Sequence, residues 1–264
     1  MNFLMGMKIL NLNCQKGEQP MLESFLRKAL DGGSYDFLLL QEVDAKVLAF
    51  LQHPSYALLR VFNEETGQDS QLCIAYRKTC RLSKSGFKSL SFMRYDPVRG
   101  FKHPAFGVLW ADFEIGGKMI RVASVHLHSG TDRHIRLAEM EMVKKILLEG
   151  DHLPTAVTGD FNAGWPGECD GLARVFAPEF SWMTKELGPT LDSRYSENVA
   201  HITNRVAAFL GIFNIGIRLR TDHAFLDSKT AGSYSMICSI LPDRVSDHSP
   251  VECMIDFTQE APIL

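Results

Sequence analysis

The chain has 264 residues, and its 28 lysines and arginines stand against 31 aspartates and glutamates, so its formal net charge at pH 7 is −3. Apolar residues make up 45% and charged residues 22% of the chain, which excludes a disordered chain, a collagen-like repeat and a small disulfide-rich protein. The slightly acidic balance argues against a protein that coats nucleic acid through bulk charge. It is compatible with an enzyme that binds phosphate through a local patch and a metal.

The organisation of the sequence is that of a single unit. No low-complexity linker, charge block or internal repeat divides it, so we expect one domain over residues 1–264. The first residues lack a basic leader followed by a long apolar stretch, and no apolar run reaches the ~20 residues that span a bilayer. We therefore expect a cytoplasmic protein without a transmembrane segment.

Short apolar runs bounded by Gly, Pro or Asp recur along the chain and predict strands that are buried on both faces. Helices are predicted where apolar residues recur at helical spacing, or where a proline opens and glycines close a segment. In chain order, the predicted elements are a strand at 8–12, a helix at 20–30, strands at 37–40, 73–76, 106–113 and 120–125, a helix at 132–148, a strand at 156–158, a helix within 196–210, and strands at 223–226 and 251–255. Strands interleaved with helices indicate the α/β class.

Polar side chains stand at the ends of several of these strands. Carboxylates at the end of a buried strand are costly unless they are paired, hydrogen-bonded or bound to a cation. Any one of them alone has a plain explanation, such as a turn at Asp160 or a cap at Glu42. Several together predict strand ends that converge on one oxygen-rich site, which suits Mg²⁺ or Mn²⁺.

Six short motifs, in order between residues 8 and 255, contain these polar residues. They are Leu12-Asn13, Gln41-Glu42, His126-Leu127-x-Ser129-Gly130, Gly159-Asp160-Phe161-Asn162, Thr221-Asp222-His223 and Ser246-Asp247-His248-x-Pro250. Together they resemble the motifs of the endonuclease/exonuclease/phosphatase superfamily, the deoxyribonuclease-I-like metal-dependent phosphoesterases. The resemblance implies a four-layer α/β sandwich, in which two packed sheets of mostly antiparallel or mixed strands are flanked by helices and carry the site at one edge.

The resemblance implies hydrolysis of a phosphodiester bond, with nucleic acid as the favoured substrate, by in-line attack of an activated water. Glu42 would be the main ligand of a Mg²⁺ or Mn²⁺ ion, with Asn13 and Asp247 in or near its shell. Asp160 would orient or deprotonate the attacking water.

The remaining catalytic roles that the resemblance implies concern the phosphate group. Asn162 would hydrogen-bond the phosphoryl oxygens. Asp222 would orient His248, and this pair would stabilise the charged phosphate in the transition state. His126 looks like the second histidine of the deoxyribonuclease-I and sphingomyelinase branches. At the same place in the sequence, the abasic-site nucleases usually carry a Tyr-x-Pro-Asn type of sequence.

Two further residues are candidates for substrate binding, each with a plain alternative. His128 shares a strand face with His126, so it is either a substrate contact or a bystander. Arg136 belongs, with Arg133, to a basic helix start that either faces phosphate or is solvated. The His-x-His pair also invites a zinc site, but Gly130 stands where the metallo-β-lactamase pattern needs an aspartate.

Residues 206–217 form an apolar stretch with a basic edge that is too short to span a membrane. They predict either a core or dimer contact, or a contact with substrate or lipid. A lipid contact would fit a second substrate class, a phospholipid head group or inositol phosphate, as in sphingomyelinases. A phosphate-binding module without catalysis is the alternative of a different class.

Overall fold

The structure is a computed structural model that describes residues 6–17, 19–62, 69–90, 106–129, 133–150, 152–192, 218–231 and 234–257. The helix predicted within 196–210 and the apolar stretch 206–217 lie outside the described residues. None of the described helices is long and apolar enough to cross a membrane.

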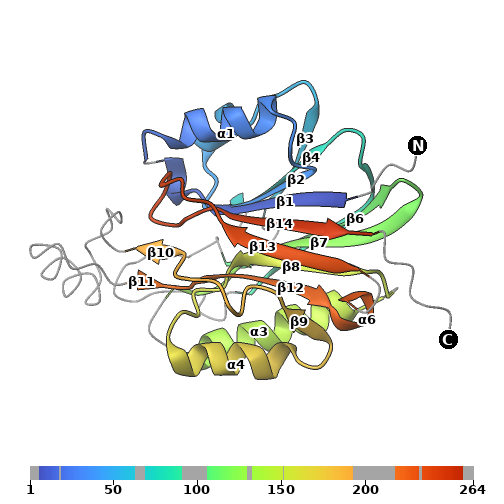
Figure 1. Ribbon diagram of the computed structural model, residues 1–264, viewed down its shortest axis with the longest axis vertical. Helices are drawn as coiled ribbons and strands as arrows, with labels where there is room; N and C mark the ends of the chain where they lie inside the picture. The colour runs from blue at the N-terminus through green and yellow to red at the C-terminus, as the bar shows by residue number, and fades with distance from the viewer. Residues whose placement is uncertain are drawn as a thin grey trace, which may run out of the picture.

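Two six-stranded sheets form the centre of the protein (Figure 1). The first sheet has the order β13 (Ser235–Ile240), β14 (Val251–Asp256), β1 (Gly6–Asn13), β2 (Phe37–Gln41), β4 (Asp69–Arg77) and β3 (Tyr56–Phe62). The second has the order β5 (Arg81–Ser89), β6 (Gly107–Ile115), β7 (Lys118–His126), β8 (Thr155–Asp160), β12 (Asp222–Asp227) and β9 (Phe180–Trp182). The pairs β1–β2 and β7–β8 are parallel and the other pairs are antiparallel, as expected for mixed sheets.

Helices cover the outer faces of both sheets. In Figure 1, α1 (Leu22–Asp31) lies above the first sheet, while α3 (Arg133–Leu148) and α4 (Pro166–Phe176) lie below the second. The short helix α2 (Ala45–Phe50) packs with α1 into the same hydrophobic cluster. The smaller elements are η1 (Gln15–Gly17), α6 (Ser228–Ala231) and the two-stranded pair β10 (Leu191–Asp192) and β11 (Arg218–Leu219). This arrangement confirms the predicted four-layer α/β sandwich.

Three hydrophobic clusters fill the spaces between the layers. On β1, Ile9 belongs to the cluster between the sheets, whereas Leu10 and Leu12 belong to the cluster under α1. This alternation follows from the two-residue period of a strand, and it explains why the strand is apolar throughout. The third cluster joins α3 and α4 to the second sheet through residues such as Val143 and Phe176.

One edge of the sandwich collects the ends of the central strands. The parallel strands β1 and β2 end there, and so do β7 and β8, because each pair runs in one direction. Strand β12 begins at this edge, since it is antiparallel to β8. The edge lies on the left in Figure 1, away from the two chain termini on the right.

Candidate active site

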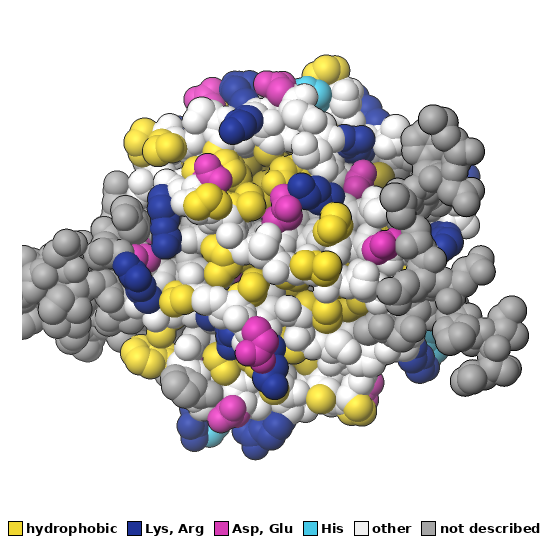
Figure 2. Space-filling model, in the orientation of Figure 1, with side chains coloured by type: hydrophobic (Ala, Val, Ile, Leu, Met, Phe, Trp, Pro, Cys, Tyr) yellow, Lys and Arg dark blue, Asp and Glu magenta, His cyan; other side chains and the backbone are white. Residues whose placement is uncertain are grey.

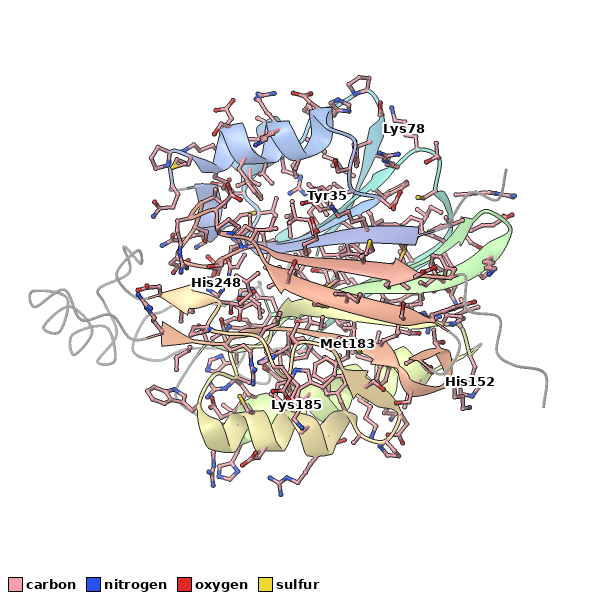
Figure 3. The ribbon with its side chains drawn as sticks, in the orientation of Figure 1. Tyr35, Lys78, His152, Met183, Lys185 and His248 are labelled. Atoms are coloured by element: carbon pink, nitrogen blue, oxygen red, sulfur yellow. The ribbon has the colours of Figure 1, made fainter. Side chains whose placement is uncertain are left out.

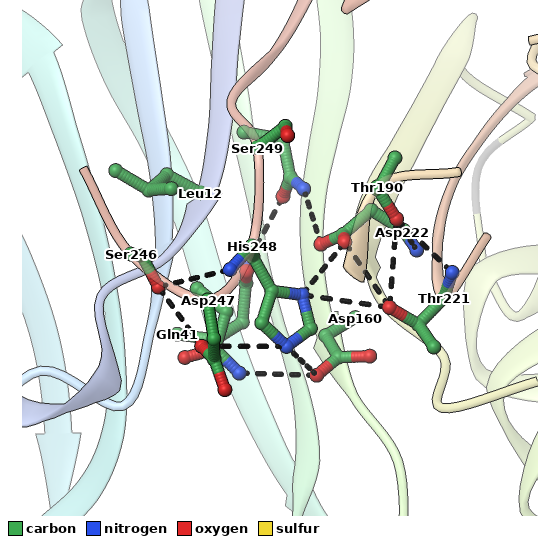
Figure 4. Close-up of polar contacts among 12 residues, drawn as sticks. Leu12, Gln41, Asp160, Thr190, Thr221, Asp222, Ser246, Asp247, His248 and Ser249 are labelled. Atoms are coloured by element: carbon green, nitrogen blue, oxygen red, sulfur yellow. Dashed lines mark hydrogen bonds and ion pairs between the residues drawn. The ribbon is translucent and has the colours of Figure 1, made fainter. Parts of the chain in front are cut away.

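The bond between His248 and Asp222 joins the two sheets at this edge (Figure 4). His248 lies just before β14 of the first sheet, and its Nδ1 is 2.8 Å from Oδ2 of Asp222, the first residue of β12 in the second sheet. Nδ1–H therefore donates to the carboxylate, and Nε2 is left to face the interior of the site. In Figure 3, His248 lies between the sheets beside β10.

Three neighbouring strands of the second sheet place a row of functional side chains opposite one another. His126 ends β7, Asp160 ends β8 and Asp222 begins β12, and strand pairing sets both His126 and Asp222 directly beside Asp160. Nε2 of His126 and Nε2 of His248 lie 3.8 Å and 3.7 Å from Oδ2 of Asp160. These separations exceed a hydrogen bond, so both imidazoles and the carboxylate border one small space.

The first sheet supplies amide and carboxylate groups to the same space. Nδ2 of Asn13, at the end of β1, donates to Oδ2 of Asp160 at 3.0 Å and to Oε1 of Glu42 at 3.3 Å. Oε1 of Glu42 is also 3.9 Å from Nε2 of His126. The Glu42 side chain is 28% exposed, whereas those of Asp160 and His126 are 2% and 3% exposed, so the site opens to solvent on the Glu42 side.

Burial and charge set the protonation states of the His248 cluster. Burial by itself would lower the pKa of His248, but the carboxylates of Asp222, Asp160 and Asp247 outweigh it and raise that pKa well above the ordinary value. Burial would raise the pKa of Asp222, but His248 holds it below the usual value. Burial raises the pKa of Asp160, against the opposing pull of His248. The site therefore contains an imidazolium bound to one carboxylate and facing a second, more basic one.

Backbone conformation presents two of the site residues. Glu42 has a φ of 53° and Asn162 a φ of 50°, a left-handed conformation that is unusual for residues other than glycine. The carbonyl of Glu42 accepts a bond of 3.1 Å from Lys16 N–H, which holds the turn after β2. Asn162 N–H donates to Oδ1 of Asp160 at 2.9 Å, and its side chain donates to the carbonyl of Leu127 at 2.9 Å. The first turn is thus held by a bond from η1, and the second by bonds that Asn162 donates to Asp160 and to the residue after β7.

Gly159 has a steric reason to precede Asp160. A Cβ at this position would lie 2.0 Å from the carbonyl oxygen and 2.6 Å from the nitrogen of Val125 on β7. Only glycine lets β7 and β8 approach this closely, and their pairing sets His126 beside Asp160.

The donor groups at this edge fit a hard divalent cation. Among the described residues, one cluster has carboxylate and imidazole donor atoms within 4.8 Å of one another, and it consists of Asp160, Asp222 and His248. The carboxylate of Glu42 and the amide of Asn13 adjoin it. Buried carboxylates that lie this close together repel one another unless a cation or a proton compensates them.

Comparison with known proteins identifies the fold. No protein-family model matches the sequence, and no curated protein matches it. Among solved structures, D. rerio TDP2 complexed with a single-strand DNA product matches with a TM-score of 0.71 at 18% identity, over 96% of this chain and 99% of that one. This chain has the deoxyribonuclease-I-like fold. An endonuclease/exonuclease/phosphatase family protein from Bacteroides thetaiotaomicron matches with a TM-score of 0.69 at 18% identity, over 97% of this chain and 99% of that one. A mannosyl-6-phosphatase from the same organism matches with a TM-score of 0.67 at 17% identity, over 95% of this chain and 100% of that one.

Within the deoxyribonuclease-I-like fold, the described polar residues of the six motifs lie at one edge of the sandwich. Asn13, Glu42, His126, Asp160 and His248 are joined by the contacts described above. Oδ1 of Asp247 lies 3.9 Å from Nε2 of His248, so this predicted ligand belongs to the same group. Asn162 is partly exposed at the rim, beside Leu127.

The two predicted substrate contacts occupy different surroundings. The Arg136 side chain is 4% exposed and pairs with the buried carboxylate of Glu168, between α3 and α4. This contact favours a structural role over the predicted contact with phosphate. His128 is half-buried, and its ring packs edge-on against Phe106, as does that of His126. The shared aromatic neighbour agrees with the prediction that both histidines lie on one face.

Sequence reasoning missed several polar residues that hold the site. The hydroxyl of Thr190 accepts bonds of 3.0 Å and 3.1 Å from the N–H groups of Thr221 and Asp222, and Asn11 donates to Oδ1 of Asp222 at 3.2 Å. Gln15 is 5% exposed, its Oε1 accepts a 3.4 Å bond from Asp247 N–H, and its Nε2 has no partner within the described part of the chain. A lone Thr or Gln in a loop carries no sequence signal that separates such a role from that of an ordinary turn residue.

Proposed function

We propose that this protein is a phosphoesterase that hydrolyses phosphodiester bonds in nucleic acid with the help of Mg²⁺ or Mn²⁺. The observation that carries the proposal is the hydrogen-bonded pair of His248 and Asp222. Within it, Nε2 of His248 faces Oδ2 of Asp160 at a distance of 3.7 Å. A positively charged donor and a basic carboxylate on two sides of one small space match the needs of water attack on a phosphate diester.

The residues of this chain divide the reaction between them. Asp160 accepts a proton from the attacking water, a role that its raised pKa favours. The Nε2–H groups of His248 and His126 donate to the phosphoryl oxygens, where negative charge accumulates in the transition state. Asp222 holds the His248 ring in orientation and stabilises its charge. Asn162 stands at the rim as a further donor or acceptor for the phosphate.

The metal would be held by Glu42 with Asn13 and Asp247. We favour this set over Asp160, Asp222 and His248, because Nδ1 of His248 and Oδ2 of Asp222 already share a hydrogen bond that a cation would have to break. The Asn13 amide now turns its NH₂ toward Glu42 and Asp160, so its carbonyl oxygen would have to turn inward to bind the ion. A bound Mg²⁺ or Mn²⁺ supplies Lewis acidity and orients the phosphate.

The choice of nucleic acid as substrate rests on the fold shared with a DNA-bound structure and on the six sequence motifs. The D. rerio TDP2 structure that shares this fold holds a single-strand DNA product. With a net charge of −3, affinity for a polyanion would come from the site and its rim. On the face drawn in Figure 2, Lys and Arg side chains stand among hydrophobic and acidic ones. A sugar phosphate is the second candidate, because a mannosyl-6-phosphatase shares the fold. A phospholipid or inositol phosphate is a third, which only the sequence motifs suggest.

The experiment is a cleavage assay on labelled single- and double-stranded DNA and RNA with Mg²⁺ or Mn²⁺, with and without EDTA. Glu42→Ala tests the metal site. Glu23→Ala, on the exposed face of α1, is the matched control for removing a carboxylate. Parallel assays use an activated phosphodiester, mannose 6-phosphate and sphingomyelin micelles. The proposal expects metal-dependent cleavage of nucleic acid that EDTA and Glu42→Ala abolish and Glu23→Ala leaves intact.

Each other outcome changes the assignment in a definite way. Activity on mannose 6-phosphate or sphingomyelin without cleavage of nucleic acid would move the substrate to that class. Phosphate binding without turnover of any substrate would leave a binding module. Cleavage that withstands EDTA would refute the metal requirement.

A further inference from the structure

An exposed tryptophan follows the candidate site residue Asn162 in the loop between β8 and α4. Trp165 is 50% exposed, and the other large hydrophobic side chains exposed among the described residues are Met21, Ile237 and Met254. Trp165 follows Asn162 by three residues, so their backbones are at most about 11 Å apart. The loop that carries the indole is thus close in the chain to a residue that borders the candidate site.

The backbone that carries this indole is firmly held. Trp165 N–H donates to Oε2 of Glu168 at 3.3 Å, which forms one half of a capping box at the start of α4. The other carboxylate oxygen of Glu168 bonds Arg136 of α3. This explains why Arg136 is buried: it ties the loop after β8 to α3, and its Nη1 also bonds the carbonyl of His128 at 3.4 Å.

The two residues before Trp165 are also anchored. Nε2–H of His223 donates to the carbonyl of Ala163 at 3.0 Å, inside the second sheet. Gly164 lies so close to Leu219 that a Cβ there would be 2.7 Å from the leucine Cβ. A segment held at three successive residues presents its one exposed aromatic ring in a defined place, which lowers the entropic cost of binding a flat partner.

An exposed cation lies near Gly167 at the start of α4, two residues after the tryptophan. Arg133, the exposed first residue of α3, reaches the first turn of α4, where its Nη1 lies 3.9 Å from the place a Cβ of Gly167 would occupy. Proteins that bind single-stranded nucleic acid combine exposed aromatic rings with cations, since bases stack on the rings and phosphates attract the cations. A plain phosphate or a sugar phosphate offers no aromatic face for this pairing.

We propose that Trp165 is a stacking platform for a nucleobase next to the scissile phosphate, with Arg133 facing the adjoining phosphate. This inference rests on the proposed function and deepens it, because it makes the protein selective for substrates with an unpaired base beside the cleaved bond. Its ligand is thus a single-stranded segment rather than a continuous duplex.

The test compares three single-stranded hexanucleotides that each contain one cleavable phosphodiester among phosphorothioates. The first has all its bases, and the others lack the base on the 5′ or the 3′ side of the cleavable bond. kcat/KM is measured for wild type, Trp165→Ala, Trp165→Phe and the control Ile237→Ala, an exposed side chain in the middle of β13. Circular dichroism and thermal melting verify the fold of each variant.

We expect Trp165→Ala to lower kcat/KM on the complete substrate on the order of tenfold, as base stacking on an aromatic side chain predicts. Trp165→Phe should retain most of the activity and Ile237→Ala all of it. On the substrate that lacks the base that stacks on Trp165, wild type and Trp165→Ala should have equal kcat/KM. In an Asp160→Asn background, the complete hexanucleotide should quench tryptophan fluorescence, and Trp165→Phe should remove most of that quenching.

The outcomes separate this inference from the proposed function. If wild type cleaves neither the hexanucleotides nor the duplexes of the cleavage assay, both fail. If it cleaves duplex but no hexanucleotide, the proposed function stands and the stacking role is refuted. If wild type cleaves the hexanucleotides but Trp165→Ala is unchanged, or loses the same factor on every substrate, the proposed function stands and the stacking role is refuted. Equal loss everywhere would mean that the indole only supports the loop.

Discussion

His248 and Asp222 form a hydrogen bond of 2.8 Å that bridges the two sheets of the sandwich. One partner precedes β14 in the first sheet and the other opens β12 in the second. The orientation of the imidazole therefore depends on how the two sheets pack. Because both groups are almost fully buried, the bond is shielded from water and salt.

Removing either of the two groups proposed to act in catalysis should slow the reaction strongly. Asp160→Asn and His248→Ala should each lower kcat by roughly 10²–10⁴, because one removes the proton acceptor and the other a positive donor to the phosphate. Steady-state kinetics on the best substrate of the cleavage assay measures the effect. A loss of less than about tenfold for Asp160→Asn would contradict the assigned roles.

Thr190 should act as a positioning residue for Asp222. Its buried hydroxyl accepts two backbone N–H groups, so Thr190→Val leaves two buried donors unpaired and should cost about 2–5 kcal/mol of unfolding free energy. Thr190→Val should also lower kcat while changing KM little, since Asp222 is no longer held in position. The matched variant Thr190→Ser keeps the hydroxyl and should restore most of both. Equal losses for Val and Ser would point to packing alone.

Glu139 should make stability depend on pH. Burial raises its pKa from 4.5 to about 7, although its carboxylate accepts the N–H of His128. The folded state then binds more protons than the unfolded state, so the stability contribution is complete below pH 4.5 and is lost as the pH rises through about 7. Glu139→Gln cannot ionise and still accepts the same bond. Its unfolding free energy should exceed that of wild type by about 1–3 kcal/mol at pH 8 and by little at pH 4.5. Urea unfolding at both pH values measures these free energies. A difference in unfolding free energy between Glu139→Gln and wild type that is the same at both pH values would contradict this prediction.

Gly159→Ala should prevent the parallel pairing of β7 and β8. The added Cβ would meet the Val125 backbone at 2.0 Å, which no rotation of a side chain can relieve. We expect a loss of roughly 3 kcal/mol or more in unfolding free energy, at the upper end of overpacking effects. Gly188→Ala is the control, because a Cβ there has no atom within 4 Å. Thermal melts within a degree of each other for the two variants would show that β7 moves aside at little cost.

The predicted strands correspond closely to those strands that lie in the middle of a sheet. The runs at 8–12, 37–40 and 120–125 became β1, β2 and β7, since both faces of these strands are covered and apolar residues are continuous. The edge strand β5 was missed because all nine of its residues are partly or fully exposed, which leaves no apolar run to recognise. The helix predicted at 20–30 begins two residues later, at Leu22, and the one at 132–148 corresponds to α3.

The sequence by itself determined which functional groups stand at the ends of the strands of this protein. Acidic, amide and imidazole residues at the ends of apolar strands predict one oxygen-rich site, because burying such groups is costly without a use. The fold and the phosphate chemistry are what the resemblance of the six motifs implies. Tertiary structure alone decided how they combine. Sequence spacing carries no information on which strands become neighbours, so the contact of Asp160 with His126 and Asp222, from strand ends 34 and 62 residues away, emerges only when β7, β8 and β12 pair. For the same reason, Arg136 is predicted from the sequence to face either phosphate or solvent but is buried against Glu168, since only the packing of α3 on α4 supplies this partner.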